Sequence, residues 1–246
     1  MSRSRGQRAG LRRWIAVGLA VAAIGGGAVA IANRQAPAPL AKRTEADRPV
    51  LLLLTSLPLM FADSFALDGV GSPALTALQR RYSVEPIGIA DAASLKGRRL
   101  LLMAHPLAQP AEALVELDAW VRAGGRLLLL ADPKLDWPSR RPLGDKLRPP
   151  PAFADTGLLG HWGLTLYAPD VAATVERRID GRVVRFGSPG TLAGGCRIVS
   201  RGAVARCTIG RGRATVIADA DFLRAENPDS ANLQFLLAEL DRIEQR

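Results

Sequence analysis

The fold is decided by one stretch, Arg98 to Pro133, which reads RRLLLMAHPLAQPAEALVELDAWVRAGGRLLLLADP. Its two apolar runs, Leu100–Met103 and Leu127–Leu130, are continuous rather than alternating. Continuous apolar runs of this length are expected for strands that are covered on both faces, as in a parallel sheet. The stretch therefore predicts two buried strands of one sheet.

The segment between these two runs has the periodicity of a helix. A proline precedes its first turn, and Gly124-Gly125 follow its last, which is where these residues commonly stand at helix ends. Its buried face is predicted to contain Ala111, Leu114, Leu117 and Val121. Strand, helix and strand form the unit from which parallel sheets are built.

The same alternation continues on both sides. An apolar run starts at Val50 and is followed by a helical segment, 72–82, and a shorter strand, 83–89. Near the C-terminus the strand of ATVIADADFL leads into a last helix, 230–245. The stripe of that helix predicted to be buried consists of Leu233, Leu236, Leu237, Leu240 and Ile243. The pattern predicts the α/β class with a doubly wound parallel sheet.

Residues 134–209 have a different character. The proline-rich segment 134–153 predicts a long surface loop over the carboxyl edge of the sheet, followed by a short helix within 154–164. Asp180-Gly181, between two alternating runs, predicts a two-residue hairpin turn. Together with a second hairpin around Arg201-Gly202, it predicts an antiparallel extension over about 165–209.

The two cysteines of the chain, Cys196 and Cys207, flank this second hairpin. A turn at Arg201-Gly202 places them directly opposite each other, which predicts a disulfide. Two reduced, unrelated cysteines are the alternative. A zinc site is not indicated, because it requires more ligands than two cysteines with no nearby histidine.

An apolar segment near the N-terminus indicates the compartment. Trp14–Ala32 has nineteen residues without charge or proline, close to the roughly 20 that cross a bilayer as a helix. The basic tail 1–13 precedes it and holds five arginines and no acid: Arg3, Arg5, Arg8, Arg12 and Arg13. By the positive-inside rule this tail stays in the cytoplasm.

We therefore expect a single-pass protein of the inner membrane, with a linker at 33–49 and a periplasmic domain at 50–246. The proline-, alanine- and charge-rich composition of 33–49 is typical of an extended tether. The alternative is a cleaved signal peptide, since AVAIA offers small residues to a signal peptidase. Both interpretations place the domain outside the cytoplasm, where disulfides form.

The formal charge of +10 does not indicate nucleic-acid binding. Without the five arginines of the tail, 28 basic residues face 23 acidic ones, spread through the chain. Nucleic-acid-binding domains typically have a basic stripe with interleaved aromatic residues, and aromatic residues make up only 5% of this chain. We expect no nucleic-acid partner.

Polar residues stand where the predicted parallel strands end, which is the edge at which such sheets bind ligands. These candidates for a ligand crevice are Ser56, His105, Asp132, Asp219 and Asp221. Ser56 lacks the glycines of a nucleophile elbow, and neither cysteine is placed to act as a nucleophile. Each aspartate also has a structural interpretation, as a strand end or helix cap. The sequence predicts no catalytic residue, metal site or cofactor.

Four motifs, RLLLMAHP, LDAWVRAGGRLLLLADP, GRGRATVIADADFL and ANLQFLLAEL, resemble the exported domain of gliding-motility-type ABC transporter auxiliary proteins. They are also similar to glutamine-amidotransferase-like domains of unknown function. The resemblance covers Pro49–Pro133 and Gly210–Leu240. It implies a flavodoxin-like, class I glutamine-amidotransferase-like sheet without a catalytic triad, tethered to the membrane beside an ABC transporter. The positions that match are Asp132, Asp219, Asp221 and Phe222, none with a catalytic role.

The sequence therefore favours a membrane-anchored, periplasmic, non-catalytic accessory or binding domain of an ABC transport system. A periplasmic hydrolase or amidotransferase-like enzyme that uses the carboxyl edge is the alternative. A purely structural domain without a small-molecule ligand is a third hypothesis.

Overall fold

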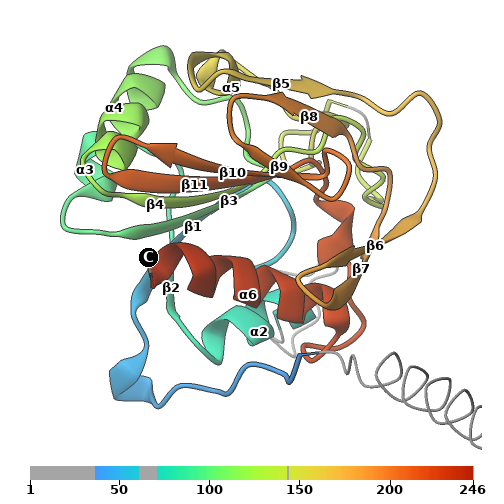
Figure 1. Ribbon diagram of the computed structural model, residues 1–246, viewed down its shortest axis with the longest axis horizontal. Helices are drawn as coiled ribbons and strands as arrows, with labels where there is room; N and C mark the ends of the chain where they lie inside the picture. The colour runs from blue at the N-terminus through green and yellow to red at the C-terminus, as the bar shows by residue number, and fades with distance from the viewer. Residues whose placement is uncertain (1–36, 61–70, 143, 246) are drawn as a thin grey trace, which may run out of the picture. The chain divides into compact units, whose positions relative to one another are not determined.

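The two strands of the opening stretch lie at the centre of a seven-stranded sheet, seen nearly edge-on in Figure 1. The strand order is β2-β1-β3-β4-β11-β10-β9. The first five strands are parallel, β10 is antiparallel to β11, and β9 is antiparallel to β10. The strands are β1 (Val50–Thr55), β2 (Ser83–Pro86), β3 (Leu100–Ala104), β4 (Arg126–Leu130), β9 (Arg197–Val199), β10 (Val204–Ile209) and β11 (Gly212–Ile217). The predicted α/β class is confirmed.

This computed structural model describes residues 37–60, 71–142 and 144–245. The predicted basic tail and membrane helix, 1–13 and 14–32, lie outside the described residues. Among the helices that are described, none has the length and apolar character needed to span a bilayer.

Helices cover both faces of the sheet, which explains the continuous apolar strands. Figure 1 shows α2 and α6 below the sheet and α3, α4 and α5 above it. Leu100 and Leu102 of β3 belong to the hydrophobic core on the side of α2 and α6, whereas Leu101 belongs to the core on the other side. The helices are α2 (Pro73–Gln79), α3 (Ala92–Leu95), α4 (Ala111–Arg122), α5 (Leu158–His161) and α6 (Ala231–Glu244), and 3-10 turns η1 and η2 span Glu45–Asp47 and Asp221–Leu223.

The two long helices follow their predicted periodicity to different degrees. All five residues of the predicted stripe on α6 are buried. On α4, Leu117 and Val121 are buried as predicted, but Ala111 is exposed, Leu114 is half-buried and Ala113 is buried instead. The buried face of α4 therefore consists of Ala113, Leu117 and Val121, which follow one another at intervals of four residues.

The segment 165–209, predicted to form one antiparallel extension, instead contributes strands to two small two-stranded sheets and to the central sheet. β6 (Val175–Ile179) pairs with β7 (Arg182–Phe186) across the predicted Asp180-Gly181 turn, and β5 (Leu164–Tyr167) pairs with β8 (Thr191–Gly194). The cysteine-bearing hairpin instead joins the central sheet, because β10 turns directly into β11 and pairs with it along six residues. Its two strands therefore extend the sheet rather than forming a separate unit.

The predicted disulfide is confirmed. Cys196 and Cys207 are bonded, with their Cα atoms 4.8 Å apart. Cys196 immediately precedes β9, and Cys207 lies within β10 on the buried side, with 5% of its surface exposed. The bond therefore fixes the edge strand of the central sheet to its neighbour.

Replacing both cysteines, as Cys196→Ala with Cys207→Ala, is expected to lower the free energy of unfolding by about 2 to 3 kcal/mol. The bond closes a short loop, and its loss returns conformational entropy to the unfolded chain. Urea denaturation of the variant checks this, and the wild type in reductant serves as control because it should lose a similar amount. An unchanged urea midpoint in both samples would contradict the prediction.

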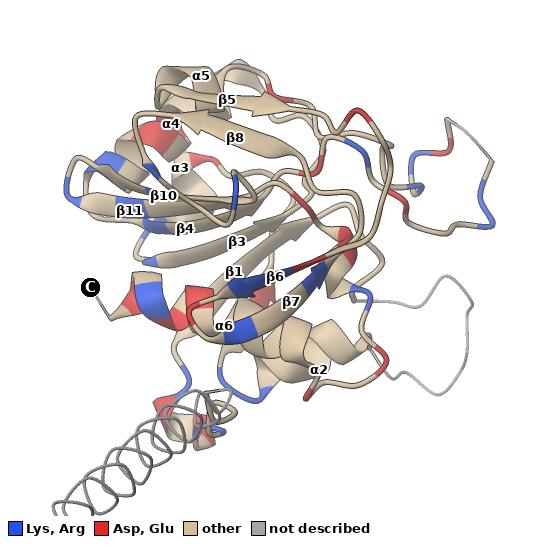
Figure 2. Cartoon of the chain, turned by 45° about the vertical axis from the view of Figure 1, so that its right-hand side comes forward, with Lys and Arg blue, Asp and Glu red and all other residues tan. Residues whose placement is uncertain are grey.

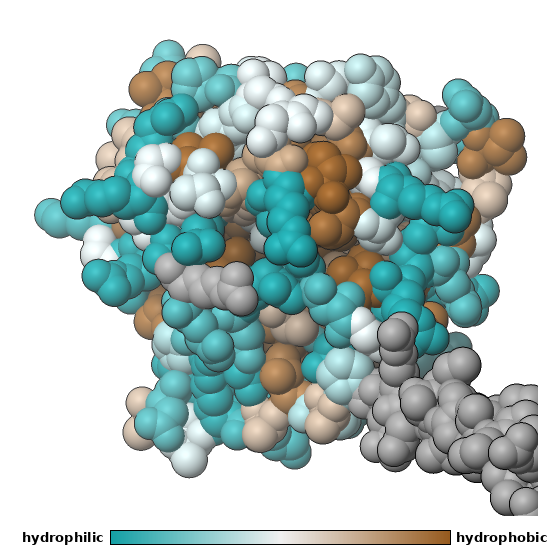
Figure 3. All heavy atoms as spheres, in the orientation of Figure 1, coloured by the Kyte–Doolittle hydropathy of each residue, from teal (hydrophilic) through white to brown (hydrophobic). Residues whose placement is uncertain are grey.

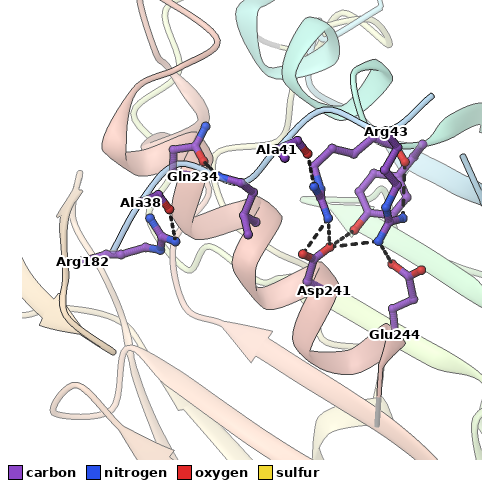
Figure 4. Close-up of polar contacts among 10 residues, drawn as sticks. Ala38, Ala41, Arg43, Arg182, Gln234, Asp241 and Glu244 are labelled. Atoms are coloured by element: carbon purple, nitrogen blue, oxygen red, sulfur yellow. Dashed lines mark hydrogen bonds and ion pairs between the residues drawn. The ribbon is translucent and has the colours of Figure 1, made fainter. Parts of the chain in front are cut away.

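Part of the predicted linker 33–49 is bound to the domain (Figure 4). The Leu40 N–H donates to Gln234 Oε1 of α6 at 2.9 Å, and Arg182 Nη2 donates to the Ala38 carbonyl at 3.1 Å. Arg43 Nη2 lies 2.9 Å from Glu244 Oε2 near the end of α6. From Ala38 onward this segment therefore lies along α6 instead of forming a free tether.

Most of the visible surface is hydrophilic. On the face drawn in Figure 3, hydrophobic residues reach the surface in separate areas among hydrophilic ones. The large hydrophobic side chains that stay exposed in the described chain come from separate elements and loops: Ile89, Leu107, Val115, Leu147, Tyr167, Val171 and Val183. Single exposed apolar side chains are common on soluble domains, so a binding site is better sought among polar groups.

Candidate functional site

The predicted site residues follow the ends of parallel strands and therefore meet at one edge of the sheet. Ser56 follows β1, His105 follows β3, Asp132 stands two residues after the end of β4, and Asp219 and Asp221 follow β11. Open α/β sheets bind ligands beyond this edge. The loop after β4 covers it, as predicted, because its Pro150 carbonyl lies 2.9 Å from His105 Nε2.

Ser56 and His105 are adjacent but are not arranged as a nucleophile and its base. The Ser56 hydroxyl donates to the main-chain carbonyl of His105 at 2.5 Å, not to the ring. The ring faces the Pro150 carbonyl, which only accepts, so Nε2 carries the hydrogen. Burial lowers the pKa of His105, which favours the neutral ring. Its Nδ1 is then an acceptor, buried without a hydrogen-bond partner among the described residues.

Asp132 and Asp219 hold the backbone where their strands end. Asp132 accepts from the Lys134 N–H at 2.8 Å with Oδ1 and from the Ala220 N–H at 2.8 Å with Oδ2. Asp219 accepts from the Phe222 N–H at 2.9 Å with Oδ1 and, with Oδ2, from the N–H of Gly187 after β7, also at 2.9 Å. Both carboxylates thus tie the loops at this edge together, in agreement with their structural interpretation.

Asp221 differs from the other two aspartates because only one of its oxygens is used. Its Oδ2 accepts from the Asp136 N–H at 2.9 Å. Its Oδ1 is buried and has no hydrogen-bond partner among the described residues. A buried acceptor without a partner is uncommon in folded proteins and points to a missing donor.

The three carboxyl groups share one buried environment, which disfavours their ionisation. Burial raises the pKa of Asp219 to about 8, and the neighbouring charge of Asp132 adds to this, against the N–H donors of Phe222 and Gly187. Burial raises the pKa of Asp221 to about 6, and the charge of Asp132 adds to this as well. The pKa of Asp132 is also raised by burial, against the N–H donors that it accepts. Such shifts are typical of buried clusters of like charge.

A cavity of about 400 Å³ opens beside Asp221. Its walls come from the loop after β4, the segment before β6, β7 and its following loop, η2 with Arg224, and α6. The polar residues that line it are Asp136, Thr174, Arg185, Ser188, Asp221, Arg224 and Asn232. Ser56, His105, Asp132 and Asp219 do not line it, so the structure brings only Asp221 of the predicted set to this cavity.

Sequence reasoning missed the two arginines and the asparagine of this cavity. Arg185 lies on an outward position of a hairpin strand, where a charged residue is ordinary. Of these three residues, Arg224 is the one that the sequence could have indicated, because it directly follows the DADFL motif and stands three residues after Asp221. Asn232 lies in the first turn of α6 and resembles a solvent-facing helix residue.

No metal site is formed by the residues that the structure describes. Among them, no group of three or more His, Cys, Asp or Glu side chains is arranged to hold an ion. The carboxylate oxygens of Asp132 and Asp219 are directed at backbone N–H groups instead.

No model of a known protein family matches the sequence, and no curated protein matches it either. Among solved structures, the chain is similar to the mmIFT52 N-terminal domain, with 13% sequence identity and a TM-score of 0.54 over 80% of this chain and 98% of that domain. This likeness shows the α/β fold.

Two glycosidases are also similar in structure. The exo-β-1,4-mannosidase Op5Man5 from Opitutaceae bacterium strain TAV5 has 16% identity and a TM-score of 0.49 over 79% of this chain and 36% of the enzyme. The GH42 β-galactosidase Gan42B has 15% identity and a TM-score of 0.48 over 80% of this chain and 30% of the enzyme. The chain therefore spans about a third of the length of these two enzymes.

Proposed function

We propose that this chain is a non-catalytic binding domain, held at the periplasmic side of the inner membrane by its N-terminal segment, where it acts as an accessory of an ABC transport system. The proposal assigns the domain a role in contacting a partner or ligand. It rests on how the polar groups of the carboxyl edge are used.

The observation that carries the proposal is the use of Ser56, Asp132 and Asp219 as structural hydrogen-bonding groups. The Ser56 hydroxyl donates to a carbonyl, and four carboxylate oxygens accept backbone N–H groups. A hydrolase would need a nucleophile within hydrogen-bond reach of a base. Groups already engaged with the backbone favour binding over catalysis.

The strand order supports a flavodoxin-like sheet. The parallel strands β2-β1-β3-β4-β11 correspond to the order 2-1-3-4-5 of flavodoxin-like folds when β11 is counted as the fifth. The resemblance to transporter auxiliary proteins implies the same sheet. In such folds the ligand lies beyond the carboxyl ends of the strands, which is the edge that the cavity beside Asp221 adjoins.

The disulfide and the N-terminal sequence support the proposed location. Disulfides persist outside the cytoplasm, and the Cys196–Cys207 bond joins β10 to the residue immediately before β9. The apolar segment Trp14–Ala32 with its preceding arginines provides the proposed anchor.

Protease protection in a Gram-negative host tests the location. With a C-terminal tag, the intact chain is expected in the membrane fraction, cleaved by external protease in spheroplasts but not in intact cells. A chain without residues 1–33 is the control and is expected in the cytosolic fraction. A full-length chain that stays in the cytosol with reduced thiols would overturn the proposed location.

Photo-crosslinking in these membranes tests the partner. A photoreactive residue is placed at Val115 of α4 or at Val183 of β7, both exposed and on different elements. At least one position is expected to give a covalent adduct with a permease or ATPase subunit. The absence of transporter adducts at both positions would contradict the proposed association.

A further inference from the structure

We propose that the cavity between β7, η2 and α6 binds a small zwitterion of the α-amino acid type. Its ammonium group would face Asp221, and its carboxylate would face Arg185 and Arg224. The inference deepens the proposed binding function by naming a ligand class, and it does not depend on which transporter, if any, the domain contacts.

The first argument is the unpartnered oxygen of Asp221. This residue is 6% exposed and lines the cavity, yet its Oδ1 has no hydrogen-bond donor among the described residues. A buried acceptor without a donor costs free energy that a bound donor recovers. An ammonium group supplies both the donor and the opposite charge, and a second acidic residue, Asp136, also lines the cavity.

The second argument is the pair of arginines. Figure 2 shows basic residues along both strands of the β6–β7 hairpin, and Arg185 is the one of these that lines the cavity. In the described part of the chain its guanidinium has no hydrogen-bond or ion-pair partner, and its hydrogen bonds to Asn232 are made by its backbone. Arg224 donates from Nη1 to the Asp136 carbonyl at 2.7 Å, which holds it in place, and its other donors have no hydrogen-bond partner within 37–60, 71–142 and 144–245. Guanidinium groups bind carboxylates with paired hydrogen bonds.

The cavity walls are held in place by the protein itself. Asn232 of α6 accepts from the Arg185 N–H with Oδ1 at 2.9 Å and donates from Nδ2 to the Phe222 carbonyl at 2.9 Å, so it joins β7 to η2. Gly187 lets these elements approach closely, since a Cβ at this position would lie 2.6 Å from the Cβ of Asp221. A site with fixed walls loses little entropy on binding.

Size and charge together select the ligand class. The volume of about 400 Å³ is near the lower end of the roughly 300 to 1,000 Å³ of small-molecule sites. Two acidic and two basic residues line it, so neither a simple anion nor a simple cation matches both kinds of residue. A molecule with one charge of each sign matches both.

Calorimetric titration of the full-length chain, purified in a mild detergent, tests the inference. The probes are the L-amino acids and, for the tightest of them, the analogue without the amine and the analogue without the carboxylate. We expect at least one amino acid to bind with a Kd below about 1 mM, and each analogue to bind at least about ten-fold more weakly. Failure of all amino acids, or equal binding of either analogue, would overturn the proposal.

Two variants and a matched control locate the site. Asp221→Asn keeps an oxygen for the Asp136 N–H but replaces the free acceptor with a donor, and Arg185→Ala removes an exposed guanidinium. Each is expected to weaken binding at least ten-fold, without lowering the melting temperature. Arg178→Ala, on the same hairpin but outside the cavity, should bind like the wild type. Loss of binding in this control, or wild-type binding by Arg185→Ala, would overturn the proposed site.

Discussion

Raising the pH from about 6.5 to 8 is expected to destabilise the folded domain by about 2 kcal/mol, because Asp219 keeps its proton when folded and loses it when unfolded. Burial and the charge of Asp132 raise the pKa of Asp219 to about 8, whereas an unfolded aspartate has a pKa of about 3.9. Over this range the folded state binds more protons than the unfolded state, so stability falls as the pH rises. Each pH unit contributes about 1.4 kcal/mol.

The difference in bound protons between the folded and unfolded states persists down to about pH 4. Asp219 alone would therefore make the folded domain as much as about 5 kcal/mol more stable at pH 4 than at pH 8. Asp221, whose pKa is raised to about 6, has an effect of the same sign at pH values below about 6, where it also makes stability fall as the pH rises. His105 acts in the opposite direction, since its lowered pKa makes stability rise with pH until the unfolded ring has lost its proton near pH 6.5. Above pH 6.5 the contributions of His105 and Asp221 are small, so the change in stability reports the buried pair Asp219 and Asp132, whose pKa values are both raised.

Urea denaturation at a series of pH values measures this dependence. Asp219→Asn cannot lose a proton, so its stability should be nearly constant between pH 6.5 and 8, although it loses one backbone hydrogen bond and starts about 1 kcal/mol lower. Asp229→Asn is the matched control, because Asp229 is an exposed partner of Arg80 and should leave the slope unchanged. A wild-type stability that does not change, or increases, over this range would show that Asp219 is ionised in the folded domain.

The sequence predicts the central sheet well because its signals are local. Each leucine of β3 and β4 is buried against one of two helical layers, and this requires the continuous apolar run that the sequence contains. The stripe of α6 and the opposed cysteines are likewise set by spacing along a single segment. The shared edge of Ser56, His105, Asp132, Asp219 and Asp221 follows from the parallel direction of their strands.

The remaining features depend on pairings between distant segments. β10 carries alternating residues that suit either a separate hairpin or an edge of the main sheet, and only its pairing with β11 decides between them. The cavity collects Asp136, Arg185 and Arg224 from three elements, and each has an ordinary surface position in its own segment. No local spacing relates them, so the site is visible only in the fold.

The contacts that charged residues of the segment before β1 make with distant parts of the chain could not be predicted from the sequence either. The composition of 33–49 predicts a tether, yet Arg43 lies 5.0 Å from the ring centre of Tyr82 and pairs with Asp241 and Glu244. Lysines and arginines in a linker are usually solvated. Nothing in the sequence indicates that carboxylates of α6 accept hydrogen bonds from this segment. These contacts fix the segment before β1 to the last helix of the domain.

Asp241→Ala is expected to lower the free energy of unfolding by about 3 to 5 kcal/mol, because Asp241 is the centre of a buried network. Arg81 Nη2 donates to both of its oxygens at 2.7 Å, and the Tyr82 hydroxyl donates to Oδ1 at 2.9 Å. Arg81 and Tyr82 are 7% and 1% exposed. Removing the carboxylate leaves a buried guanidinium without its counter-charge, which is costlier than losing a surface ion pair.

Denaturation in guanidinium chloride measures this loss, with Glu244→Ala as the matched control on the same helix. Among the described residues Glu244 pairs with Arg43 alone, in a more exposed position, and its removal should cost less than about 1 kcal/mol. Because Arg81 also donates to the Ala41 carbonyl and Arg43 reaches Asp241, the segment 38–48 should become susceptible to limited proteolysis in Asp241→Ala but not in Glu244→Ala. Equal, small losses in both variants would mean that α2, the segment before β1 and α6 are held together by apolar packing alone.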